Sequence, residues 1–100
     1  MPAPRIQAQF DDLKKIAETF NQGADEIQTM TKNLMSCKDT LKNGDWKGKG
    51  ADQFYNEMDG EVLPTLKRLN EALAQASQIT NQVVQTMQQA QDESQAVLRA

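Results

Sequence analysis

The stretch NGDWKGKG, residues 43–50, decides how this chain folds. It holds three of the five glycines and the only tryptophan, and polar or charged residues fill its other four positions. Glycine adopts turn conformations at little steric cost, so the stretch predicts a tight turn. Gly44 is expected to end the preceding helix in the left-handed conformation. Asp45 is expected to cap the next helix, which would place Trp46 in its first turn.

Upstream of the turn, apolar residues recur every seven positions. The central row is Ile6, Leu13, Phe20, Ile27, Leu34 and Leu41, and two neighbouring rows contain Ile16, Met30 and Cys37 on one side and Phe10, Ala17 and Ala24 on the other. Three adjacent rows make a broad apolar stripe, which is typical of an amphipathic helix packed along one face. We expect one helix over about residues 5–42.

Downstream of the turn, a second row is spaced by seven: Tyr55, Val62, Leu69, Ala76, Val83, Ala90 and Val97. It predicts a second helix over about residues 46–95, followed by a frayed tail. Pro64 lacks a backbone N–H, and its ring presses on the carbonyl of Gly60. The second helix is therefore expected either to bend near Pro64 or to break there into two helices.

Only a turn of about residues 43–49 separates the two predicted helices, so they must fold back antiparallel. The sequence thus predicts one all-α domain over residues 1–100, an antiparallel helix-turn-helix hairpin. Gly48 is expected on the inward seam, where a larger residue would wedge the helices apart.

The chain carries more apolar side chains than one seam can bury. The surplus side chains are Phe10, Leu63, Leu66, Leu73, Val84 and Met87. Burying each fully is worth roughly 1.5 to 3 kcal/mol, so we expect a second hairpin to cover them in a four-helix bundle. The partner is either a second copy or a related hairpin. Residues 72–91 are uncharged and rich in glutamine, and this face is either solvated or a polar contact between chains.

Composition excludes several functions. A net charge of −3 and a pI near 4.8 argue against nucleic-acid binding. There is no histidine, and Cys37 is the only cysteine, so we predict no catalytic site, no metal site and no cofactor. Cys37 falls on an inward row, where a buried, inert thiol is favoured over a reactive one.

Apolar runs in the chain are short. None approaches the roughly 20 residues that a membrane span needs, and the first residues lack the apolar core of a secretory signal. Any export is therefore expected to start from a cytoplasmic pool and to use no cleavable signal peptide.

Trp46 and Gly48 form a Trp-x-Gly triplet at the centre of a hundred-residue chain, between two amphipathic helices. Ala51 and Phe54 follow as a small residue and then an aromatic one. In these features the chain resembles the WXG-motif family, the early secretory antigenic target-like proteins exported by type VII secretion systems. The resemblance implies a small, non-enzymatic, secreted dimer that is an effector, adaptor or chaperone. It also implies contact with a secretion ATPase or another export component, through a signal that combines the turn with a C-terminal tail motif.

That tail motif is a tyrosine followed four residues later by an acid, and the last residues of this sequence contain no tyrosine. Tyr55 and Asp59 have the right spacing but follow the turn, and we interpret their match as chance. A cytoplasmic coiled-coil scaffold that is not exported is therefore the alternative function. For Trp46 itself, the alternatives are covering the end of the hairpin and contacting a partner.

Overall fold

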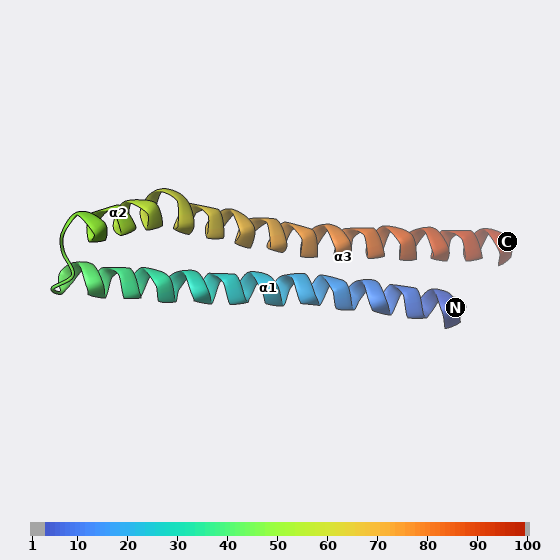
Figure 1. The fold of residues 1–100 in the computed structure, drawn as a ribbon. Coiled ribbons are helices and arrows are strands. Elements are labelled where there is room, and N and C mark those ends of the chain that lie inside the picture. Colours follow the sequence, from blue (N-terminus) through green and yellow to red (C-terminus); the bar gives the residue numbers. More distant parts are fainter. Residues whose placement is uncertain (1–3, 100) are drawn as a thin grey trace. The chain divides into compact units, whose positions relative to one another are not determined.

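The computed structural model describes residues 4–99, and all regular elements in this range are helical (Figure 1). Helix α1 spans Pro4–Asn43. After a short loop, helix α2 spans Lys49–Glu57, a π-helical turn η1 spans Met58–Val62, and helix α3 spans Leu63–Arg99. The two long helical arms form a hairpin, which confirms the predicted all-α helix-turn-helix fold.

Two predicted boundaries of the second arm differ from the structure. Its first helix begins at Lys49 rather than near residue 46, and α3 extends through Arg99 rather than ending near residue 95. At Pro64 the arm does not break into separate helices, because η1 joins α2 to α3 without an interruption. Among the described residues, no helix combines the length and hydrophobicity that a membrane span needs.

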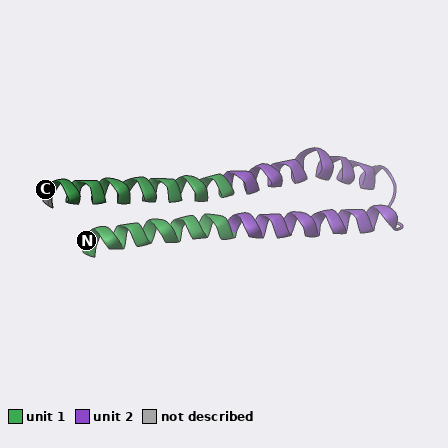
Figure 2. Cartoon of the chain, turned by 180° about the vertical axis from the view of Figure 1, so that it is seen from behind, with its two compact units in different colours: residues 1–22, 73–100 green, residues 23–72 purple. Residues whose placement is uncertain are grey.

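The chain divides into two compact units (Figure 2). Residues 1–22 and 73–100 form the first unit, of which 4–22 and 73–99 are described, and residues 23–72 form the second. In the first unit, Phe10 and Val84 are each 2% exposed and Ala17 is 1% exposed. These side chains are the core of this unit. Phe10 and Val84, expected at a contact with a second chain, are thus already covered within their own.

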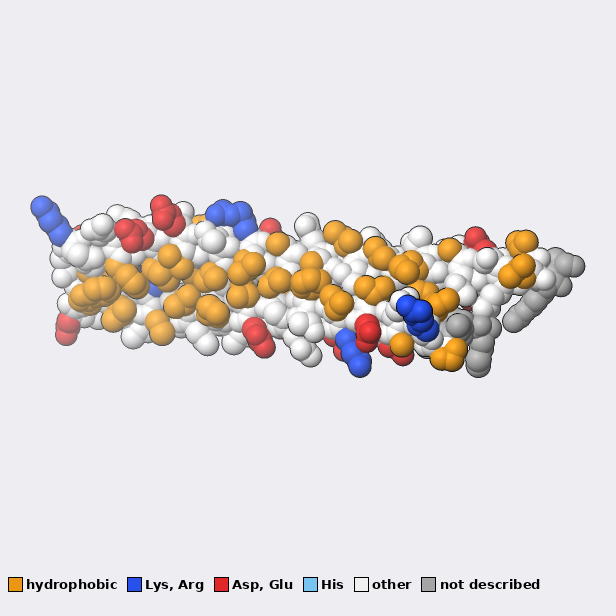
Figure 3. All heavy atoms as spheres, turned by 45° about the vertical axis from the view of Figure 1, so that its right-hand side comes forward, with side chains coloured by type: hydrophobic (Ala, Val, Ile, Leu, Met, Phe, Trp, Pro, Cys, Tyr) orange, Lys and Arg blue, Asp and Glu red, His pale blue; other side chains and the backbone are white. Residues whose placement is uncertain are grey.

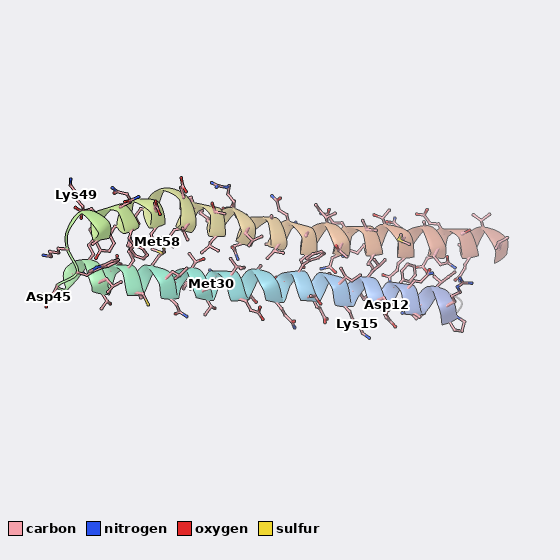
Figure 4. All side chains as sticks on the ribbon, in the orientation of Figure 1. Asp12, Lys15, Met30, Asp45, Lys49 and Met58 are labelled. Carbon is pink, nitrogen blue, oxygen red and sulfur yellow. The ribbon has the colours of Figure 1, made fainter. Side chains whose placement is uncertain are left out.

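In the second unit, the buried apolar side chains are Ala24 from α1, Ala51 and Tyr55 from α2, and Met58 from η1. Figure 4 shows Met58 on the side of the second arm that faces α1, whereas Lys49 points away from it. The side-chain amide of Asn70 donates a hydrogen bond to the carbonyl oxygen of Ala24. This bond gives the half-buried amide of Asn70 a partner and ties α3 to α1.

The π turn explains why the predicted seam of the second arm is wrong beyond Pro64. In η1 the N–H of Leu63 donates to the carbonyl oxygen of Met58, five residues back instead of four. One extra residue enters the turn, and the helix that follows is rotated by about one residue, or roughly 100°. Val62, Leu69 and Val83 of the predicted inward row are accordingly 39%, 43% and 45% exposed.

The inward positions of the second arm show the same shift. Among the buried and half-buried residues of this arm, which also include Pro64 and Ala76, one series follows the seam: Ala51, Tyr55, Met58, Leu63, Leu66, Asn70, Leu73, Ser77, Thr80 and Val84. Their spacing alternates between three and four residues everywhere except across η1, where Met58 and Leu63 are five apart. The π turn therefore accommodates a single inserted residue in an otherwise regular heptad pattern.

Candidate functional site

Three of the chain's five aromatic residues gather where the hairpin turns. The ring centroids of Trp46 lie 5.2 Å from Phe54 and 5.6 Å from Tyr55, and those of Phe54 and Tyr55 are 5.8 Å apart. All three pairs are tilted or edge-to-face, the arrangement that aromatic quadrupoles favour. We call these three residues the aromatic tip.

Tyr55 anchors the aromatic tip. It is 5% exposed, and its hydroxyl donates a 2.8 Å hydrogen bond to the backbone carbonyl oxygen of Trp46, nine residues earlier. Lys42 Nζ, from the end of α1, lies 5.8 Å from the centre of the Tyr55 ring, within reach of a cation–π interaction. Burial and, second, the charge of Asp52 raise the pKa of Tyr55 above its ordinary value, so the hydroxyl remains a donor at neutral pH.

Trp46 is held by this anchor but is not buried, since 43% of it is exposed. Its indole packs against Phe54 and Tyr55, and the rest of its surface is open to solvent. It lies in the loop that precedes α2, not in the first helical turn as predicted, because α2 begins three residues later at Lys49.

Gly48, not Asp45, occupies the N-cap position of α2, and no side chain caps this helix. Gly48 has φ 125° and ψ 179°, a backbone region that is essentially restricted to glycine. The N–H of Asp52 donates to its carbonyl oxygen at 2.9 Å, which starts the helix. A Cβ added at Gly48 would meet no atom within 4 Å, so the predicted wedge against the other helix is wrong. Conformation, not space, requires glycine here.

Gly44 also differs from its prediction. Among the described residues Gly48 alone has a positive φ, so Gly44 does not end α1 in the left-handed conformation. Its N–H donates instead to the carbonyl oxygens of Thr40 and Leu41, at 3.0 and 3.3 Å. These bonds continue the helical pattern past Asn43 and satisfy two C-terminal carbonyl groups of α1.

Replacing Gly48 by alanine is expected to lower the unfolding free energy by about 1 to 3 kcal/mol, because alanine is strained in this backbone conformation. Gly50 is the matched control, since it is helical, exposed and equally free of neighbours around an added Cβ. Gly50→Ala should leave the stability unchanged or raise it by up to about 1 kcal/mol. Urea denaturation followed by circular dichroism measures both variants, and equal effects would contradict the conformational role of Gly48.

An ion pair links the two arms one turn from the aromatic tip. Lys38 Nζ lies 2.7 Å from Asp59 Oδ1 and 3.5 Å from Asp39 Oδ1, and the Lys38 side chain is 12% exposed. The hydrogen bond to Asp59 is the main cause that raises the pKa of Lys38 above its ordinary value. Lys38 occupies an inward heptad position of α1 that an apolar residue would otherwise fill. The ion pair with Asp59 compensates the charge of this largely covered ammonium group.

The other sequence-predicted residues lie outside the tip. Cys37 is exposed, so the prediction of a buried thiol is wrong. Leu63, Leu66 and Leu73 are half-buried, and Met87 is 43% exposed. No cluster of potential metal ligands occurs within residues 4–99.

Comparison with protein families connects this geometry to a known group. The family model described as "Proteins of 100 residues with WXG" matches residues 5–92. The chain belongs to the WXG100 family. Its WXG triplet is Trp46-Lys47-Gly48, so the family signature comprises the exposed indole of the aromatic tip and the positive-φ glycine that starts α2. WXG100 proteins are small secreted helical proteins of the early secretory antigenic target type, substrates of type VII secretion and not enzymes. Searches of curated proteins and of solved structures found no significant match.

Tyr55 is the site residue that the sequence analysis of this WXG100 chain missed. It was assigned to the seam row, and its spacing to Asp59 was interpreted as chance. The signal that could have found it is its position four residues after Ala51 and directly after Phe54, in the first two turns of the helix after the triplet. Its bond to a loop carbonyl depends on the loop path, which no periodicity encodes.

Proposed function

We propose that this chain is a type VII secretion substrate that leaves the cell as a folded helical dimer and acts as an effector, adaptor or chaperone through protein contacts. The observation that supports this most directly is the aromatic tip. Its tyrosine is buried and bonded, while the indole of Trp46 is 43% exposed within the triplet that defines the family. A large aromatic surface held rigidly costs little entropy when it binds, which suits an export component as partner.

A row of exposed apolar side chains supports the dimer. The exposed stripe, as we call it, lies in the second unit and comprises Met30, Cys37, Leu41, Phe54, Val62 and Leu69. In the first unit, Ile16, Val83 and Met87 are likewise exposed. Figure 3 shows hydrophobic side chains gathered on one face between polar and charged ones. A second hairpin laid over this stripe would form the four-helix bundle. The π turn moves the expected interface from Val84 and Leu63 to Val83 and Leu69.

Trp46→Ala is expected to reduce the amount of protein in the culture supernatant at least tenfold, because it removes the exposed anchor of the contact, and anchors of this kind carry 2 kcal/mol or more. Supernatant and cell pellet from a type VII-competent host are compared by immunoblot. Gln75→Ala, which shortens an exposed polar side chain of α3, is the control and should be exported like the wild type.

Circular dichroism must show that Trp46→Ala keeps its helix content, so that lost export is not lost folding. If the wild type itself stays in the pellet, the proposal fails and the chain is better understood as a cytoplasmic scaffold. Equal export of Trp46→Ala and the wild type would mean that the aromatic tip does not contact the export component.

Met30→Glu combined with Leu69→Glu is expected to convert the dimer into a folded monomer. Both residues lie on the exposed stripe of the second unit, where they are 46% and 43% exposed, so the charges meet water in the monomer but apolar surface in the dimer. Size-exclusion chromatography with light scattering measures the mass. A wild type that is already monomeric at micromolar concentration would contradict the dimer.

A further inference from the structure

An open groove of about 640 Å³ lies beside the π turn, within the second unit. Met35 of α1 and Leu63 and Pro64 of α3 supply its apolar surface. Polar and charged side chains, Lys32 and Lys67 among them, complete its lining, and we call these polar lining residues its rim. We call the whole feature the π-turn groove. Apolar and polar side chains together line protein-binding pockets, and π turns are frequent at functional sites.

The charges on the rim are not balanced. The carboxylate of Asp59, which lines the groove, is already paired with Lys38 at 2.7 Å. Within residues 4–99, neither Lys32 nor Lys67 has an ion-pair partner at 4 Å or less. Glu71 is the other acid among the lining residues and also lacks such a partner. Two ammonium groups therefore stand beside one unpaired carboxylate, although the chain as a whole carries a net charge of −3.

The groove and the exposed stripe lie on different faces of the hairpin. Met30 of the stripe and Lys32 of the rim are two residues apart on α1, which separates them by about 200° around the helix. The same holds on α3 for Leu69 of the stripe and Glu71 of the groove. A second hairpin that covers the stripe would leave the groove accessible. Its occupant is thus a partner other than the second hairpin of the dimer.

We propose that the π-turn groove binds an acidic peptide segment of another protein, which inserts one apolar side chain over Met35, Leu63 and Pro64 and places carboxylates beside Lys32 and Lys67. Apolar burial supplies the attraction, and the unpaired lysines select the charge of the flanking residues. A fatty acid has the same combination of apolar and anionic groups. Lys32, Lys67 and Glu71 are exposed and the groove is open, so a long alkyl chain would remain largely in water, which favours a peptide.

Fluorescence polarisation with two labelled peptides tests the proposal. The first has a leucine between two pairs of glutamates, and the second has lysines in place of the glutamates. At low salt, where charge pairing is least screened, the acidic peptide is expected to bind at least about tenfold more tightly than the basic one. Lys32→Glu combined with Lys67→Glu is expected to weaken binding of the acidic peptide by at least about tenfold. The same double variant should bind the basic peptide more tightly than the acidic one.

Two methionines of α1 provide a matched pair of variants. Met35 lies in the groove and is 45% exposed, whereas Met30 lies on the stripe and is 46% exposed. Met35→Trp should fill the groove and weaken binding of the acidic peptide at least about tenfold. Met30→Trp should bind the same peptide with an affinity within about twofold of the wild type. Circular dichroism checks that each variant is folded.

The proposal is overturned if the acidic peptide does not bind the wild type at about 1 mM, if both peptides bind equally, or if the two tryptophan variants behave alike. Laurate is the third probe. Tighter binding of laurate than of the acidic peptide, lost in Met35→Trp, would assign the groove to a lipid and not to a peptide. None of these measurements depends on export, so they stand or fall separately from the proposed function.

Discussion

Replacing Phe10 by alanine is expected to lower the unfolding free energy by about 3 to 5 kcal/mol, the range for removing a buried aromatic side chain. Phe10 is 2% exposed, and it is the largest side chain in the core of the first unit, whose other members include Ala17 and Val84. The small neighbours cannot expand to fill the space, so a cavity remains between the helices. Urea denaturation followed by circular dichroism at a fixed protein concentration measures the loss.

Ile79→Ala is the control for Phe10→Ala in the same unit. Ile79 is 57% exposed and takes no inward position, so its truncation should change the stability by no more than about 0.5 kcal/mol. If Phe10 instead lay at a contact between chains, as the sequence pattern suggested, the cost of Phe10→Ala would grow with protein concentration. A loss that is small at low concentration and large at high concentration would therefore contradict the intrachain assignment.

The sequence was sufficient for the helical hairpin because two long amphipathic patterns flank a glycine-rich turn. It misplaced the seam of α1 by one row. Phe10, Ala17 and Ala24 are the most buried residues of this helix, while Ile16 and Met30 are nearly half exposed. Hydrophobicity alone ranks isoleucine above alanine. Close approach of two helices instead favours small residues at the contact, and the larger side chains then lie beside it.

For the candidate site, the sequence analysis named Trp46 and Gly48, which both lie in the loop before α2. It did not identify the reason for the glycine, because the spacing of apolar residues carries no information on a single loop residue with φ 125°. The structure also assigns Tyr55 a role that its place in a heptad row concealed. Local loop geometry, which depends on a few dihedral angles, is the part of the site that pattern reasoning cannot supply.

The seam of the second arm was misplaced for a different reason, a change of phase at η1. A heptad row continued through Pro64 reaches Val62, Leu69 and Val83, which are exposed, whereas the packed residues lie one position later. A proline predicts a local disturbance but not its form. Only the positions of the packed residues on both sides distinguish a bend from an inserted residue.

Deleting Gly60 in a Pro64→Ala background is expected to preserve the seam. With one residue removed from η1, the inward positions on both sides fall into an unbroken alternation of three and four, and a regular α-helix can replace the π turn. The Pro64→Ala change is needed because proline within a regular helix costs about 3 kcal/mol. The unfolding free energy should equal or exceed that of Pro64→Ala alone, because the deletion removes a glycine, and glycine is the least favourable residue within a helix apart from proline.

Deleting Gln75 in the same Pro64→Ala background is the matched control and has the largest expected effect. It rotates the rest of α3 by about 100°, so that Gln78 and Gln85 take the inward positions of Ser77 and Val84. Val84 is exposed and Phe10 loses its cover, which costs roughly 1.5 to 3 kcal/mol for each side chain, or about 3 to 6 kcal/mol together. Chemical denaturation compares the two deletions. If they destabilise the chain equally, η1 is not an inserted residue in a heptad pattern, and the shift of phase no longer explains why Leu69 and Val83 are exposed.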